Sequence, residues 1–246
     1  MTSALTIHVV GVGMGPQHVT PEAAAALGEA AYVVAARKRD DDPLLAVRRE
    51  LAAAHGLEVV EVDDPPRDRS EHRDASSYDG AVRDWHDARA RAWGSAVAGR
   101  EGDPAFLVWG DPALYDSTIR VVDRVAADLG ARTRVVAGIS APQLLAARHG
   151  VVLHEVGRPV HVTTQRRQAE AVEQGQRNLV VMLTSGVRLD GLDDWSIWWG
   201  ANLGARGERL VSGRVGDVRE ALERARAEAE TDAGWVMDLY LLRGPA

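Results

Sequence analysis

Residues 8–27 read HVVGVGMGPQHVTPEAAAAL, an apolar run that ends in closely spaced glycines and leads into an alanine-rich segment. A short apolar run of this kind, bounded by glycine, predicts a buried strand. Thr20 is a good helix N-cap and Pro21 suits the first helical position, so a helix is expected to begin near Pro21. The stretch therefore predicts a strand, a wide loop and a helix, which together form the repeating unit of α/β folds.

The glycine loop does not match the dinucleotide-binding fingerprint G-x-G-x-x-G. Gly11 and Gly13 occupy its first two glycine positions, but Pro16 stands at the third, which normally permits close packing of helix on strand. The next predicted strand is followed by Arg37 and Lys38 rather than by an acidic residue that would bind a ribose. Because these two cations suit a 2′-phosphate, an NADP-binding oxidoreductase stays open as an alternative.

The alternation of apolar runs and amphipathic segments continues along the chain and predicts an α/β fold with a mainly parallel sheet. Strands are expected at residues 5–10, 31–35, 58–62, 105–108 and 133–136, with helices beginning near residues 21, 43, 79 and 115. A second series of strands and helices begins with RPVHVTTQ at residue 158 and ends with a strand in GWVMDLYLL. We expect two domains, residues 1–154 and 155–246, divided near the polar turn at residues 154–158.

The amino-acid composition excludes several classes of function and of catalytic group. The 246 residues include 29 Lys and Arg against 36 Asp and Glu, a formal charge of −7 that disfavours a nucleic-acid partner. The chain has no Cys, which excludes disulfides, thiolate nucleophiles and Cys-ligated metals. The eight His residues show no metal-ligand spacing, so no metal is expected. The sequence has no signal-peptide layout and no apolar stretch near the ~20 residues that span a bilayer, which predicts a cytoplasmic protein without membrane contact.

Residues 64–98 form the one unusual stretch, DPPRDRSEHRDASSYDGAVRDWHDARARAWGSAVA. Its first half is a charged loop, and its second half is a possible helix with Val82, Trp85, Ala92 and Trp93 loosely on one side. The mostly solvated composition favours a surface insertion, with a substrate lid or a subunit contact as alternatives.

Two further segments place residues suited to ligand binding at the ends of predicted strands. WGDPALYDST, residues 109–118, follows an apolar strand with Gly110, which allows close backbone approach, and with the carboxylate of Asp111. AGISAPQ, residues 137–143, follows the next strand with small residues that would line the same edge. Open α/β sheets bind ligands at the carboxyl ends of their strands, so both loops are candidate binding loops.

Taken in order, GVGMGP, TPEA, WGDPALYDST, AGISAPQ, NLVVML and NLGARGERLVSG resemble the motifs of the tetrapyrrole methylases, which are S-adenosylmethionine-dependent methyltransferases. The resemblance covers nearly the whole chain. It implies two α/β domains, each with a central sheet flanked by helices, with an active-site cleft between them. It further implies a homodimer and S-adenosylmethionine as the methyl donor.

Carried over position by position, the resemblance implies contacts to the donor from nine residues: Met14, Trp109, Gly110, Asp111, Leu114, Ser140, Ala141, Leu183 and Leu203. Met14 departs from the proline usual there, and Leu183 stands where relatives often have methionine. Asp111 is expected to be catalytic as an orienting group or base, and Tyr115 as a hydrogen-bond donor. The glycines of the first loop are expected to make room for the tetrapyrrole and the donor together.

WGDPALYDST combined with the Trp-rich WSIWWGANLGARGERLVSG is most similar to the branch of the family that acts in aerobic cobalamin biosynthesis. That branch methylates precorrin-5 at C1 and releases acetate to give precorrin-6A. The substrate would be an anionic tetrapyrrole, with Arg37, Lys38, Arg120 and Arg148 as candidate carboxylate-binding residues. Another tetrapyrrole methylase, a diphthine-type methylase and a non-catalytic adenosyl-ligand-binding protein remain alternatives.

Overall fold

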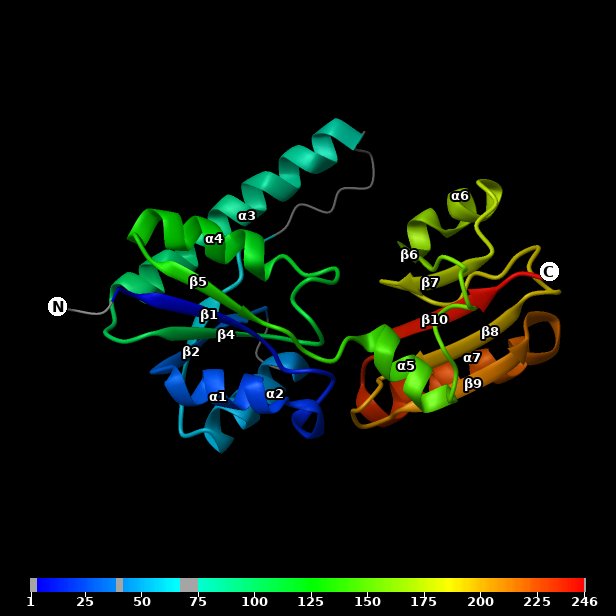
Figure 1. Cartoon of the computed structure of the whole chain (residues 1–246), viewed down its shortest axis with the longest axis horizontal. Helices are drawn as coiled ribbons and strands as arrows, with labels where there is room; N and C mark the ends of the chain where they lie inside the picture. Colours follow the sequence, from blue (N-terminus) through cyan, green and yellow to red (C-terminus); the bar gives the residue numbers. More distant parts are fainter. Residues whose placement is uncertain (1–3, 39–41, 67–74, 246) are drawn as a thin grey trace. The chain divides into compact units, whose positions relative to one another are not determined.

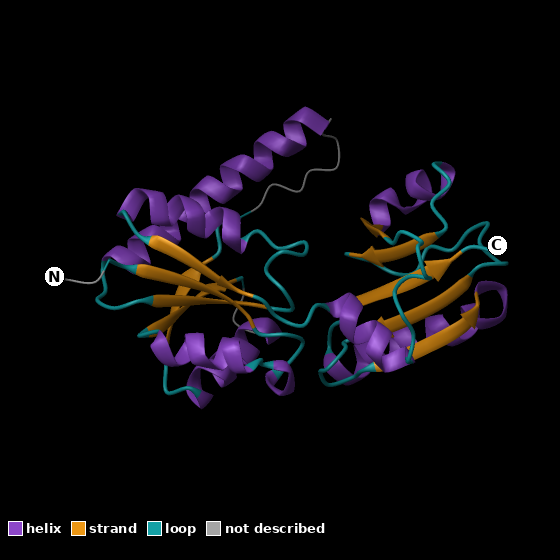
Figure 2. Ribbon diagram, viewed as in Figure 1, coloured by secondary structure: helices purple, strands orange, loops and turns teal. Residues whose placement is uncertain are grey.

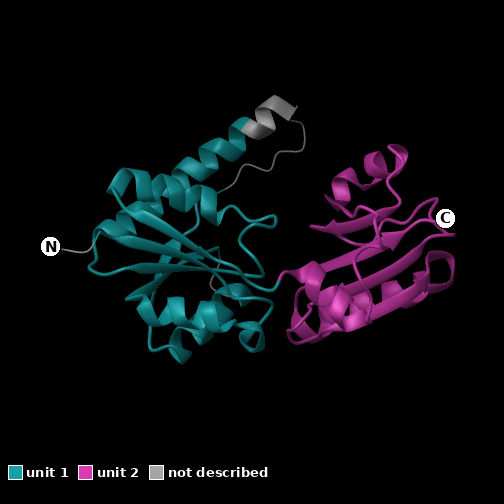
Figure 3. Ribbon diagram, viewed as in Figure 1, with its two compact units in different colours: residues 1–139 teal, residues 140–246 magenta. Residues whose placement is uncertain are grey.

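The computed structural model describes residues 4–38, 42–66 and 75–245, with the side chains of residues 75–79 excepted. The chain divides into two compact units, residues 1–139 and 140–246 (Figure 3). Each unit has its own five-stranded sheet. The predicted α/β class with two sheets is confirmed.

The first unit is built on a parallel sheet in the order β3-β2-β4-β1-β5 (Figure 1). Its strands are β1 (Thr6–Gly11), β2 (Tyr32–Arg37), β3 (Glu58–Asp63), β4 (Pro104–Val108) and β5 (Arg132–Val136). All five lie within a residue or two of the predicted positions. The inner strands β2, β4 and β1 are buried on both faces and read as nearly continuous apolar runs, which is why the sequence located them.

Helices cover both faces of this sheet (Figure 2). On one face α1 (Pro21–Glu29) and α2 (Pro43–Ala54) bury Leu27 and Leu51 against Val10 and Val33 of the strands. On the other face lie α3 (Ala75–Ala98) and α4 (Thr118–Leu129). Helix α1 begins as predicted, because the Thr20 hydroxyl accepts a hydrogen bond of 3.1 Å from the backbone N–H of Ala23.

Helix α3 is not the surface insertion that the sequence predicts. Ala90, Trp93 and Val97 are buried in the same cluster as Phe106 of β4 and Val125 of α4, so the helix forms part of the layer that covers the sheet. Residues 67–74 of the predicted charged loop lie outside the described residues. The prediction was wrong because polar residues outnumber apolar ones over residues 64–98 as a whole, although within the helix the apolar ones recur on one face.

The second unit has a mixed sheet in the order β6-β7-β10-β8-β9, in which β6 and β7 are parallel and the other pairs antiparallel. Its strands are β6 (His161–Thr164), β7 (Asn178–Met182), β8 (Ser196–Ala201), β9 (Arg209–Arg214) and β10 (Asp238–Arg243). The sequence did not predict β9, because its residues RLVSGR are only half-buried at an edge and form no apolar run.

The core of this unit lies on one sheet face. Ile197 and Trp199 of β8 pack there with Tyr240 of β10 and with Leu222 of α7 (Val215–Ala233), and α6 (Gln168–Glu173) contributes further contacts. Side chains alternate along a strand, so Gly200 faces the opposite side, where α5 (Ala141–His149) packs. A Cβ at Gly200 would lie 2.8 Å from Cδ1 of Leu145 in α5, which explains the glycine.

Helix α5 decides where the two units divide. Because it packs on β8, β9 and β10, the division falls between Ile139 and Ser140, ahead of the turn at residues 154–158 where the sequence places it. The predicted domains, residues 1–154 and 155–246, stay a prediction about which segments fold as units.

His8 is a buried core residue in β1. Its ring is 2 % exposed, and neither ring nitrogen has a hydrogen-bond partner among the described residues. Burial lowers the pKa of His8 from its ordinary 6.5, and the nearby Arg134 guanidinium lowers it further. Burial therefore favours the neutral form of the ring.

Within the described residues no helix is long and apolar enough to cross a membrane. The same residues contain no group of three or more potential metal ligands. The predicted absence of a metal stays a prediction.

Candidate functional site

In the first unit, three loops meet at the carboxyl edge of the sheet. They follow the neighbouring strands β4, β1 and β5, and they contain Gly110, Gly13 and Gly138 respectively. Gly13 and Gly110 exchange two backbone hydrogen bonds, of 3.2 and 2.7 Å, and both have left-handed backbones, with φ of +68° and +77°. The predicted convergence of these loops on one edge is therefore present in the structure.

Gly11 and Gly138 leave room for neighbouring backbone, a role that the sequence analysis did not assign to them. The expected role of the first loop's glycines toward the tetrapyrrole and the donor stays a prediction. A Cβ at Gly138 would lie 2.2 Å from the carbonyl oxygen of Gly110 and 2.9 Å from Cα of Gly11. A Cβ at Gly11 would lie 2.6 Å from the backbone nitrogen of Gly138. All three distances are too short for a side chain, so these glycines allow the three loops to pack against one another.

Asp111 joins two of these loops. Its Oδ2 accepts a hydrogen bond of 2.9 Å from the backbone N–H of Gly138, and its Oδ1 accepts one of 2.8 Å from the backbone N–H of Ala113. Both carboxylate oxygens thus bind the protein backbone, which is the arrangement of an orienting group.

The other predicted residues of this unit lie on the same loops. Met14 is buried, and Leu114 is half-buried with its backbone N–H bonded to the carbonyl of Asp111. The indole N–H of Trp109 is buried and has no hydrogen-bond partner among the described residues. Tyr115 is exposed and has a left-handed backbone with φ of +51°, an unusual conformation for a bulky residue.

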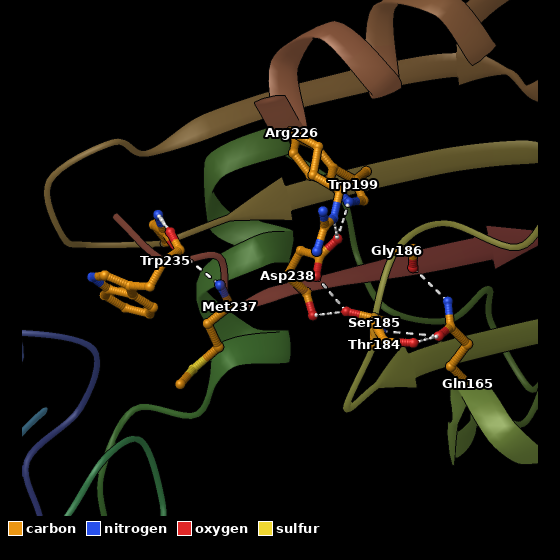
Figure 4. Close-up of polar contacts among 10 residues, drawn as sticks. Gln165, Thr184, Ser185, Gly186, Trp199, Arg226, Trp235, Met237 and Asp238 are labelled. Carbon is orange, nitrogen blue, oxygen red and sulfur yellow. Dashed lines mark hydrogen bonds and ion pairs between the residues drawn. The ribbon is translucent and has the colours of Figure 1, made fainter. Parts of the chain in front are cut away.

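In the second unit, Leu183 lies where β7 ends, and it too has a left-handed backbone, with φ of +53°. The next residue, Thr184, donates its hydroxyl hydrogen bond to Asp238 at the start of β10, where the backbone carbonyl lies 2.8 Å away and the carboxylate is also in contact (Figure 4). Asp238 also accepts a 3.0 Å hydrogen bond from the indole N–H of Trp199 and pairs with Arg226 at 3.5 Å.

Asn202 occupies the matching position after β8. Its φ is +49°, its side-chain amide donates to the carbonyl of Trp235 at 3.0 Å, and its side-chain oxygen accepts from the N–H of Met237 at 2.8 Å. Leu203, predicted to contact the donor, follows directly and has a fully buried side chain. Residues at the start of β10 or just before it therefore bond to Asn202, directly after β8, and to Thr184, the residue that follows Leu183.

The remaining predicted donor residues, Ser140 and Ala141, form the N-terminus of α5. The backbone N–H and the hydroxyl of Ser140 both bond to the side-chain oxygen of Gln143, each at 3.0 Å. Among the candidate cations for substrate, Arg37 pairs with Asp63, and Arg148 pairs with Glu208 at 2.8 Å. Neither arginine is therefore a free cation that awaits a carboxylate.

Sequence reasoning missed Thr184, Asn202 and Asp238. Thr184 and Asn202 adjoin residues that the resemblance did mark, namely Leu183 and Leu203. One feature of the sequence could have identified Asp238: it is the only carboxylate in the apolar strand GWVMDLYLL. A charge buried in such a strand requires partners.

Comparisons with known proteins assign the family. The family model described as Tetrapyrrole (Corrin/Porphyrin) Methylases matches residues 6–219. A protein of Sinorhizobium sp. named precorrin-6A synthase [deacetylating] is 40% identical over 250 residues, which cover 96% of this chain and 94% of that protein.

Solved structures agree in fold. A cobalamin synthesis-related protein (CobF) from Corynebacterium diphtheriae matches with a TM-score of 0.81 and 35% identity over 98% of this chain and 99% of its own. A uroporphyrin-III C-methyltransferase from Thermus thermophilus, solved in complex with S-adenosylhomocysteine, matches with a TM-score of 0.57 and 20% identity over 97% and 92% of the two chains. These findings decide against the NADP-binding oxidoreductase, and this chain belongs to the tetrapyrrole (corrin/porphyrin) methylases.

Proposed function

We propose that this chain is an S-adenosylmethionine-dependent C-methyltransferase that methylates precorrin-5 at C1 and releases acetate, giving precorrin-6A in aerobic cobalamin biosynthesis. The observation that carries the proposal is the 40% identity, over 96% of this chain, to the protein named precorrin-6A synthase [deacetylating]. The proposal includes a homodimer that works in the cytoplasm, as the family resemblance implies.

The residues present fit a methyl donor of this kind. The buried indole N–H of Trp109, without a partner among the described residues, is a hydrogen-bond donor available to a polar ligand. Bound S-adenosylmethionine supplies a methyl group already activated on a sulfonium, so no nucleophilic side chain is required, in keeping with a chain that has no Cys. The protein's task is to align the donor with the substrate carbon and to exclude water from that position.

We assign donor contacts to the loop residues Met14, Trp109, Gly110 and Leu114 and, in the second unit, to Ser140, Ala141, Leu183 and Leu203. Asp111 positions the loops through its two backbone hydrogen bonds. Release of acetate needs water to add to the acetyl carbonyl; the bond to the macrocycle then breaks and its electron pair stays with the conjugated ring. Tyr115, which is exposed and lies four residues after Asp111, is the hydrogen-bond donor proposed for this step.

The test is incubation of the full chain with precorrin-5 and methyl-labelled S-adenosylmethionine under anaerobic conditions, with label in the tetrapyrrole and free acetate measured together. We expect both signals in equal amounts. Label without acetate would retain methylation and refute the deacetylating assignment. Neither signal, in a protein that still binds S-adenosylhomocysteine, would point to a different substrate, including the diphthine-type alternative.

The Asp111→Asn variant tests the role of that carboxylate. Asn can accept only one of the two backbone hydrogen bonds and turns an N–H group toward the other, which costs about 1–3 kcal/mol. We expect S-adenosylhomocysteine to bind about tenfold more weakly by calorimetry, because the loop carrying Gly138 loosens. The exposed Asp123→Asn on α4 is the matched control and leaves binding unchanged. Unaltered affinity with a reduced kcat would instead make Asp111 a base.

A further inference from the structure

Leu183 holds a backbone conformation that leucine rarely adopts. Its φ is +53°, and its side chain is 65% exposed, so no burial of that side chain explains the conformation. A left-handed residue other than glycine persists only where its surroundings determine it, and such residues concentrate at functional sites. The neighbours of Leu183 must therefore hold it.

The three residues after Leu183 are held at two points (Figure 4). Thr184 bonds to Asp238 of β10. Ser185 donates from its backbone N–H and from its hydroxyl to the side-chain oxygen of Gln165, at 3.0 and 3.2 Å, and the amide of Gln165 donates back to the carbonyl of Gly186. Leu183 thus lies between β7 and the segment 184–186, which hydrogen bonds to Asp238 and Gln165 hold in place.

Asp238 is itself firmly placed. Its side chain is 0% exposed, and its carboxylate receives the Trp199 indole N–H, the Thr184 hydroxyl and the charge of Arg226. A buried carboxylate with three partners does not rearrange easily, because any movement leaves a charge unpaired. Asp238 is therefore a fixed reference point for Thr184.

We propose that Asp238, acting through the Thr184 hydroxyl, is a positioning residue that holds Leu183 in its left-handed conformation and so presents the Leu183 backbone to the methyl donor. This inference rests on the proposed function, because it takes Leu183 as a donor contact. Neither Asp238 nor Thr184 need touch the donor for this role.

The decisive variant is Thr184→Val, which removes the hydroxyl and keeps the branched shape. By calorimetry with S-adenosylhomocysteine, we expect binding to weaken by about 10- to 100-fold, the range that misplacement of a contact produces. Thr231→Val on α7 is the control, since its hydroxyl also bonds to a backbone carbonyl, at 2.9 Å, but at an exposed position. The control is expected to bind like the unaltered protein.

Rescue separates positioning from general stability. Glycine adopts the left-handed conformation without support, so adding Leu183→Gly to Thr184→Val is expected to recover most of the lost affinity. A merely structural role of the Thr184 hydroxyl would not be repaired by this change. Unchanged binding in Thr184→Val, or a loss that Leu183→Gly fails to rescue, would overturn the proposal.

Crystal structures of the unaltered chain and of Thr184→Val give a readout that does not depend on the donor. We expect a positive φ at residue 183 in the first and its loss in the second; retention in both would overturn the proposal. If the unaltered chain failed to bind S-adenosylhomocysteine, the proposed function would fail, whereas the loss of the positive φ would still support Asp238 and Thr184 as positioning residues.

Discussion

The Gly138→Ala variant is expected to lose donor binding. The new Cβ would lie 2.2 Å from the Gly110 carbonyl oxygen and 2.8 Å from the Gly11 carbonyl carbon, both of them backbone atoms that cannot rotate away. The loops of β1, β4 and β5 must therefore separate, and the 2.9 Å hydrogen bond from Gly138 to Asp111 is strained with them. Overpacking of this kind costs about 3 kcal/mol.

Two measurements check this result. Denaturant unfolding should show the loss of stability, and calorimetry with S-adenosylhomocysteine should show no measurable binding. The matched control is Gly28→Ala in α1, where a Cβ meets nothing within 4 Å and alanine gains about 0.5–1 kcal/mol as the better helix former. If Gly138→Ala bound the donor product normally, the close packing of the three loops would not matter for binding.

The Trp199→Ala variant is expected to be the most destabilising change in the second unit. Trp199 is fully buried among Leu222, Ala229 and the strands, and removal of a buried Trp side chain costs about 3–5 kcal/mol. The change also takes a hydrogen bond from the buried carboxylate of Asp238, which adds about 1–3 kcal/mol. The total approaches the whole stability of an ordinary domain, about 5–15 kcal/mol.

Trp198 supplies the control for this prediction. It precedes Trp199 in β8, points to the opposite face and is only half-buried, with the Arg243 guanidinium 5.0 Å from its ring. Trp198→Ala is expected to cost about 1 kcal/mol, measured by thermal unfolding of both variants. Trp199→Phe keeps most of the volume and isolates the lost hydrogen bond. Equal destabilisation by Trp198→Ala and Trp199→Ala would contradict the assignment of the core to one face.

The parallel sheet of the first unit could be predicted from sequence because its inner strands β2, β4 and β1 are buried on both faces. Phe106 and Val33 stand in unbroken apolar runs, whereas the edge strand β9 has only Leu210 and Val211 between polar residues and glycine. Helix α3 was misjudged for a related reason. Its burial depends on Ala90, Trp93 and Val97, which stand among charged residues along the helix and follow a strongly charged segment.

The sequence predicted individual residues of the site but not the hydrogen bonds that join them. Asp111 was identified from its place after a strand, yet its bond to Gly138 joins residues 27 positions apart and has no local signature. The packing of Gly11 against Gly138 was not predicted, because a sequence shows where a side chain is missing but not which backbone lies there. Thr184 and Asp238 are 54 positions apart, and only the antiparallel register of β10 against β7 brings them together.

The strand order of the second unit has a consequence for synthesis. The first unit has all five of its strands once residue 136 has been made, but the second has its strands in the order β6-β7-β10-β8-β9, so the last strand made is the middle one. During synthesis, the edges of β7 and β8 that later pair with β10 stay unpaired until β10 has been made and inserts between them. Exposed strand edges invite pairing with other chains, so this interval is when the nascent protein most needs a chaperone.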